Sequence, residues 1–69
     1  MPKYKIDNST KFLHTFFLSA DVYSADKIDE MVDPFVVETC ISNRMIEEIF
    51  NDGKRLYRIL PEGKKVVGR

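Results

Sequence analysis

Only a few side chains in this sequence have the chemistry that catalysis or metal binding requires. His14 is the single histidine and Cys40 the single cysteine, whereas a closed zinc site takes about four nitrogen or sulfur ligands. Cys40 lies between Thr39 and Ile41, without a basic neighbour in sequence to activate its thiol. We therefore expect Cys40 to be a small buried hydrophobic residue, and His14 to be structural or exposed rather than catalytic.

Acidic and glycine residues give no stronger indication of an active site. Glu47 and Glu48 are adjacent, so on a strand they would point to opposite faces and could not act as a carboxylate pair. Gly53, Gly63 and Gly68 are isolated and read as turn residues, not as a phosphate-binding loop. We expect no enzyme, no cofactor and no metal site.

The charged residues are unevenly distributed although the formal net charge is zero. Residues 21–52 carry nine acidic residues against two basic ones, a net charge of −7, whereas residues 53–69 carry six basic residues against Glu62, a net charge of +5. A basic stripe on one face can bind phosphates even when the total charge is zero. The alternative is an ordinary solvated surface of mixed charge.

Length and composition indicate one folded domain that spans residues 1–69. The apolar fraction of 43% and the charged fraction of 32% are those of a globular protein rather than a disordered chain. The apolar run 12–20 is interrupted by His14 and Thr15, and no run approaches the ~20 apolar residues of a membrane span. We expect a cytoplasmic protein with no signal peptide and no membrane contact.

The first expected helix is capped by Ser9 or Thr10 and runs to about Ala20. Its apolar residues recur at helical spacing and form one broad face, which we expect to be core: Phe12, Leu13, Phe16, Phe17 and Ala20. The phenylalanines offer more apolar surface than the remaining short elements are expected to cover. A homodimer is therefore predicted over a stable monomer, and the stripe is alternatively a surface for another partner.

Two further helices are expected after a connector at residues 21–23. Ser24 is the predicted N-cap of a helix from Ala25 to about Val32, which would bury Ile28, Met31 and Val32. Asp33-Pro34 starts the third helix, with Asp as N-cap and Pro at the first position. That helix carries Phe35, Val36, Val37, Cys40 and Ile41. Residues 3–6 are either a short strand or an ordered tail.

The end of the third helix has two interpretations. In the first, it stops near Ser42 or Asn43, and Asn51-Asp52-Gly53 forms the turn of a β-hairpin between residues 45–50 and 55–60, a combination typical of hairpins. In the second, the helix continues to Phe50 and Gly53 is its C-cap residue. We favour the hairpin because of its turn residues.

The segment after this turn, Tyr57-Arg-Ile-Leu-Pro-Glu-Gly-Lys64, resembles the wing of the winged helix-turn-helix DNA-binding family. The resemblance covers residues 44–67 well and the rest of the chain by element order. It implies an α+β, mainly α, domain in which three helices are followed by a C-terminal β-hairpin. It also implies double-stranded DNA as partner and a role in transcription or in phage or mobile-element regulation.

In that family the third helix enters the major groove and the wing touches the backbone or the adjacent minor groove. Carried over by position, the recognition helix is 34–43, and the DNA-binding residues are Thr39, Ser42, Asn43 and Arg44 on the helix with Lys54, Arg55, Lys64 and Lys65 at and beyond the wing. This helix is short and has Glu38 in its middle. We therefore expect the wing to supply most of the binding energy, with Lys54 and Arg55 projecting from the body.

The alternative function is a small protein-interaction module or inhibitor. Several acidic residues of the two central helices would form one face able to bind a basic protein partner: Asp26, Asp29, Glu30, Asp33 and Glu38. Each of these acids also has an ordinary interpretation as a solvated or helix-capping residue.

Overall fold

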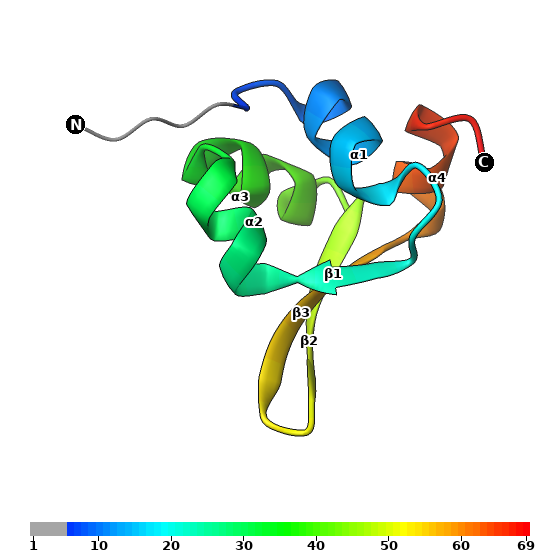
Figure 1. Ribbon diagram of the computed structural model, residues 1–69. Coiled ribbons are helices and arrows are strands. Elements are labelled where there is room, and N and C mark those ends of the chain that lie inside the picture. Colours follow the sequence, from blue (N-terminus) through cyan, green and yellow to red (C-terminus); the bar gives the residue numbers. More distant parts are fainter. Residues whose placement is uncertain (1–5) are drawn as a thin grey trace.

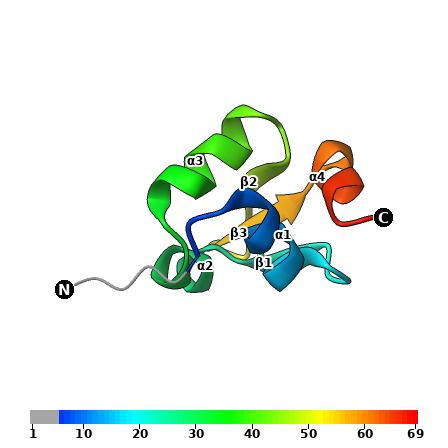
Figure 2. The ribbon, with the colours of Figure 1, turned by 90° about the horizontal axis from the view of Figure 1, so that it is seen from above.

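The computed structural model describes residues 6–69, which form a small α+β domain (Figure 1). Its elements are, in order, α1 (Ser9–Phe17), β1 (Val22–Ser24), α2 (Ala25–Met31), α3 (Pro34–Ser42), β2 (Ile46–Asn51), β3 (Lys54–Ile59) and α4 (Pro61–Val66). The helices gather around one end of the sheet, and the β2–β3 hairpin extends away from them (Figure 1). Seen from above, α3 and α4 lie on either side of β2 (Figure 2).

The sheet has three antiparallel strands in the order β1-β3-β2. β3 is the central strand, with Tyr57 opposite Tyr23 of β1 and Glu48 of β2. The expectation that residues 21–23 form only a connector is therefore wrong. Three residues are too few to show an alternating pattern, and the strand exists because β3 supplies its hydrogen-bonding partner.

The predicted hairpin is confirmed, and the alternative of a helix continuing to Phe50 is wrong. The connection has Asp52 at φ 56° and Gly53 at φ 76°, the pair of positive φ angles that defines a two-residue type I′ turn. Asn51 and Lys54 are the last paired residues on either side of it. This turn matches the twist of the strands, so the register of the whole hairpin follows from it.

The predicted starts of α2 and α3 are also confirmed. The Ser24 side chain accepts a hydrogen bond from the Lys27 N–H at 3.4 Å, and the Asp33 carboxylate accepts one from the Phe35 N–H at 2.9 Å. α1 differs slightly, because its N-cap is Asn8, whose side chain accepts from the Lys11 N–H at 3.0 Å. α1 also ends at Phe17, earlier than the expected Ala20.

The prediction of three helices followed by a C-terminal hairpin is wrong in one respect, because a short helix follows the hairpin. α4 begins with Pro61 at its first position, has Glu62 in its first turn, and carries Lys64 and Lys65 in its last turn. Proline is suited to a first helical position, and these charges suit the helix dipole. Gly63, which we interpreted as a turn glycine, is a buried residue inside this helix.

The core is built around the phenylalanines of α1, as predicted. Phe12 and Phe17 are fully buried and their rings meet edge to face, with centroids 5.9 Å apart. Because Phe16 is buried as well, a single chain covers the apolar stripe of α1. The homodimer was expected because this stripe would stay partly uncovered, so that argument does not hold. Met31, which we expected to be buried, is instead exposed.

The N-terminal strand expected at residues 3–6 lies mostly outside the described residues. At its end, Ile6 is buried and forms a single parallel bridge with Val32.

Candidate nucleic-acid interface

The exposed face of α3 is more apolar and acidic than a DNA-reading helix requires. Phe35 is 73% exposed, and Glu38 and Ile41 are exposed on the same helix. Thr39 is half-buried and its hydroxyl donates to the Phe35 carbonyl at 2.8 Å, so its hydroxyl is engaged within the helix. No lysine or arginine lies within α3 itself.

The other predicted helix residues lie together at the C-terminal end of α3, where Ser42, Asn43 and Arg44 are all exposed. The end of the helix is closed by two backbone bonds, from the Arg44 N–H to the Ile41 carbonyl at 3.0 Å and from the Met45 N–H to the Cys40 carbonyl at 2.8 Å. This is the Schellman arrangement, in which the residue after the cap takes a left-handed conformation. That residue is Arg44, at φ 60°.

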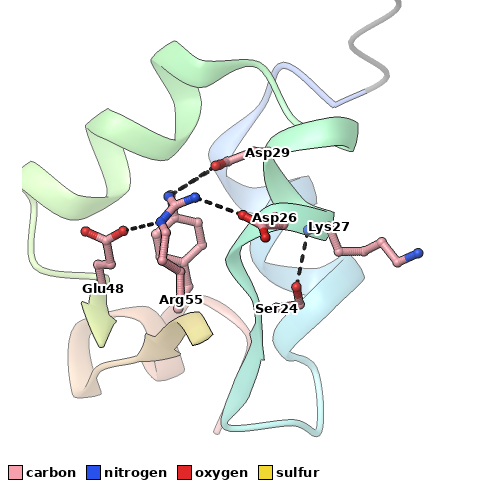
Figure 3. Close-up of polar contacts among 7 residues, drawn as sticks. Ser24, Asp26, Lys27, Asp29, Glu48 and Arg55 are labelled. Carbon is pink, nitrogen blue, oxygen red and sulfur yellow. Dashed lines mark hydrogen bonds and ion pairs between the residues drawn. The ribbon is translucent and has the colours of Figure 1, made fainter. Parts of the chain in front are cut away.

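The two basic residues predicted at the wing have different surroundings. Lys54 is exposed at the hairpin turn. Arg55 does not project from the body as expected, because its guanidinium is surrounded by three carboxylates (Figure 3). Its side chain is only 36% exposed. Of the two wing-tip cations, Lys54 alone is therefore placed to meet a phosphate without rearrangement.

We call Arg55, Asp26, Asp29 and Glu48 the Arg55 cluster. The Arg55 Nε donates to Glu48 Oε2 at 2.6 Å, Nη1 to Asp26 Oδ1 at 3.0 Å, and Nη2 to Asp29 Oδ2 at 3.2 Å. The bond to Glu48 and, next, the bond to Asp29 raise the pKa of the guanidinium above its already high value. The arginine is thus a fully charged group held by α2 on one side and by β2 on the other (Figure 3).

Tyr57 connects this cluster to the core. Its hydroxyl donates to Asp29 Oδ1 at 3.2 Å and accepts from Arg55 Nη2 at 3.2 Å. Burial and, next, the negative charge of Asp29 raise the pKa of Tyr57 to about 12. The phenol therefore remains a neutral donor at neutral pH, and it links the ion pairs to the buried side of the sheet.

Lys64 and Lys65 are separated from the hairpin turn by the length of β3. They lie on α4, and Lys65 pairs with Glu62 at 3.3 Å. At about 3.3 Å per residue, the six residues of β3 separate the two basic groups by roughly 17–20 Å. The predicted DNA-binding residues thus fall into three groups, at the end of α3, at the hairpin turn and on α4.

Part of the predicted acidic face is used within the chain. Asp26 and Asp29 hold Arg55, and Asp33 caps α3, which leaves Glu30 and Glu38 as exposed acids without these roles. Glu47 pairs with Arg58, while its neighbour Glu48 pairs with Arg55. The two glutamates therefore point to opposite faces of the sheet, as expected for adjacent strand residues.

The sequence did not predict the contact of Arg55 with α2. It did contain a signal for the pairing of Arg55 with Glu48. The turn at Asp52-Gly53 fixes the register, and in this register Glu48 is diagonal to Arg55 on one face of the hairpin. No local signal brings Asp26 and Asp29 to the same place, because they lie more than twenty residues away along the chain.

Cys40 and His14, the two side chains with potential catalytic chemistry, lie in the core and on the surface of α1, respectively. Cys40 is fully buried, as predicted, and burial raises the pKa of its thiol. His14 is exposed, with Nδ1 2.9 Å from the Thr10 carbonyl of its own helix. Within residues 6–69 no group of three or more His, Cys, Asp or Glu side chains is arranged to hold a metal ion.

No helix in the described part of the chain has the length and apolar character to cross a bilayer. Comparison of the chain with protein families, with curated proteins and with solved structures finds no match.

Proposed function

We propose that the chain is a winged-helix-like domain that binds double-stranded DNA as a small regulator of transcription or of a mobile element. The observation that carries the proposal is the succession of α2, α3 and a β2–β3 hairpin with Lys54 at an exposed type I′ turn. This succession, with the Tyr57–Lys64 segment, is the basis of the resemblance to winged helix-turn-helix proteins. A projecting hairpin with a basic tip suits contact with the DNA backbone.

In this mode of binding the end of α3, not its middle, approaches the bases. Glu38 in the middle of the helix would repel phosphates, whereas Asn43 and Arg44 are exposed beyond it. Asn can pair with adenine and Arg with guanine in the major groove. Lys54 contributes a phosphate contact, which releases counterions and makes the affinity depend on salt.

A salt titration of binding to duplex DNA tests the proposal. We expect measurable affinity near ~50 mM salt that falls steeply as salt rises, because the contacts are to phosphates. Lys54→Ala should weaken binding and reduce the slope of log affinity against log salt by about one unit. Lys27→Ala on α2 removes an exposed lysine outside the three groups and serves as the matched control. Absence of binding near ~50 mM salt would contradict the proposal.

A second candidate, binding of a basic protein partner, is favoured by the face of α3. Phe35 is 73% exposed, and the helix presents Glu38 and Ile41 but no basic side chain. An exposed aromatic residue beside acids suits a basic, partly apolar protein surface better than a polyanion. If this candidate is right, Phe35→Ala abolishes partner capture while Lys54→Ala leaves it unchanged.

A further inference from the structure

We propose that the Arg55 cluster is an autoinhibitory latch: Asp26, Asp29 and Glu48 occupy the guanidinium in place of DNA phosphate, and their release of Arg55 increases the affinity for DNA. This inference rests on the proposed function. It adds a regulatory contact to it, because the wing would exist in a closed state, which the structure describes, and in an open state in which Arg55 reaches the DNA backbone.

The hydrogen bonds of the Arg55 guanidinium support the idea that carboxylates of the same chain take the place of DNA phosphate. Nε, Nη1 and Nη2 each donate to a different carboxylate, at 2.6, 3.0 and 3.2 Å. The planar guanidinium matches carboxylate and phosphate oxygens in the same way. Each nitrogen of the guanidinium is thus already engaged by an anionic partner, so a phosphate must displace at least one of the carboxylates to bind Arg55.

The net charge of the Arg55 cluster explains how the latch lowers the affinity for DNA. Three carboxylates surround one guanidinium, so the side of the hairpin that faces α2 carries a net negative charge of two. In the closed state this charge repels DNA phosphates from the side of the wing that faces α2. Removing carboxylate charge therefore acts twice, by weakening the repulsion and by freeing a cation.

The latch joins two parts of the fold that are distant in sequence. Arg55 lies on β3, whereas Asp26 and Asp29 lie on α2, 29 and 26 residues away. The Asp26 and Glu48 side chains are 81% and 39% exposed. Exposed ion pairs are weak and are screened by salt, so the contact can exchange with an external anion.

The test compares affinity for duplex DNA, and its salt dependence, among charge-matched variants. Asp26→Asn/Asp29→Asn removes two carboxylates of the cluster. Asp7→Asn/Glu30→Gln removes two exposed carboxylates outside it and corrects for the general loss of negative charge. The Arg55→Ala substitution is then combined with each double variant, and circular dichroism and thermal unfolding show that each protein is folded.

If the latch exists, Asp26→Asn/Asp29→Asn binds DNA roughly ten-fold more tightly near ~50 mM salt than the Asp7→Asn/Glu30→Gln control. Its salt slope also becomes steeper by about 0.9, since one further phosphate contact is formed. The steeper salt slope should disappear when Arg55 is replaced by alanine, and the gain in affinity should fall to the part that comes from weaker repulsion. Should the α2 variant prove unstable, Glu48→Gln on the hairpin is expected to give the same effects at smaller size.

Equal gains in the two double variants, or a steeper salt slope and a full gain in affinity that persist without Arg55, would overturn the latch while leaving DNA binding in place. Failure of the wild type and of every variant to bind DNA near ~50 mM salt would instead reject the proposed function together with the latch.

Discussion

The clearest sign of local strain is the backbone of Arg44. This residue holds φ 60° at the end of α3, where the Schellman bonds require a left-handed residue. A side chain in this region costs about 1–2 kcal/mol, and glycine avoids that cost. An exposed arginine at such a position is consistent with a functional role for its charge, since strained residues concentrate at functional sites.

At this scale we predict that Arg44→Gly stabilises the protein while weakening DNA binding. The substitution should increase the free energy of unfolding by about 0.5–1 kcal/mol, because relief of strain exceeds the added flexibility of the unfolded chain. Urea unfolding measures the first effect and the salt titration the second. Asn43→Gly is the control, since Asn43 has φ −91° and should gain nothing. A less stable Arg44→Gly protein would refute the prediction.

Among the secondary-structure elements, α4 depends on the close approach of Gly63 to Met45 and Ile59. A Cβ atom added to Gly63 would lie 2.4 Å from the Met45 carbonyl oxygen and 2.8 Å from Ile59 Cγ1. The helix therefore rests on the backbone where β2 is about to begin and on the end of β3. The Leu60 N–H donates to the same Met45 carbonyl at 2.8 Å, so this carbonyl cannot move away freely.

We predict that Gly63→Ala destabilises the protein although alanine favours helices. Propensity alone would stabilise α4 by about 1 kcal/mol, but a clash with the backbone costs more than that gain. Overpacking of this kind typically costs about 1–3 kcal/mol, so the net effect should be a lower urea midpoint. Lys65→Ala, an exposed change on the same helix, should alter stability by less than about 0.5 kcal/mol. A Gly63→Ala protein as stable as the wild type would show that α4 does not dock as described.

At the scale of the whole molecule, Arg69 ties the described C-terminal end to the junction between α1 and β1. Its Nη1 donates to the carbonyls of Phe17 at 3.3 Å and Ala20 at 3.1 Å, and its Nη2 to Asp21 Oδ1 at 2.6 Å. The hydrogen bond and charge of Arg69, followed by the charge of Lys64, lower the pKa of Asp21. One side chain thus bonds the Phe17 carbonyl, which the end of α1 leaves without a helical partner, and the Ala20 carbonyl beyond it.

This contact predicts a pH dependence of stability. Since the pKa of Asp21 is lower in the folded protein than its ordinary value of 3.8, its stabilising effect is fully present above pH ~4 and is lost as the pH falls through the folded pKa. Asp21→Asn should therefore melt at a lower temperature than the wild type at pH ~7, and the difference should vanish in strong acid. Asp7→Asn, which removes an exposed carboxylate without a described ion pair, is the control. A difference in melting temperature that remains constant in acid would contradict this role of Asp21.

The sequence by itself determined the features that depend on neighbouring residues. Ser24 and Asp33-Pro34 specify two helix starts because a capping side chain reaches an N–H only two or three residues ahead. Asp52-Gly53 specifies the hairpin because few residues accept positive φ. The phenylalanines of α1 specify the core face through helical spacing. In each case the deciding interaction spans a few residues.

Only the tertiary structure decided which charged side chains form ion pairs and which short segments become helix or strand. Arg55 reads as an exposed wing cation until α2 brings Asp26 and Asp29 against it. β1 and α4 are too short to form alone, and they exist because β3 and the Met45 backbone supply their contacts. The physical reason is that charge pairing and docking depend on distance in space, which residues far apart in the chain acquire only after folding.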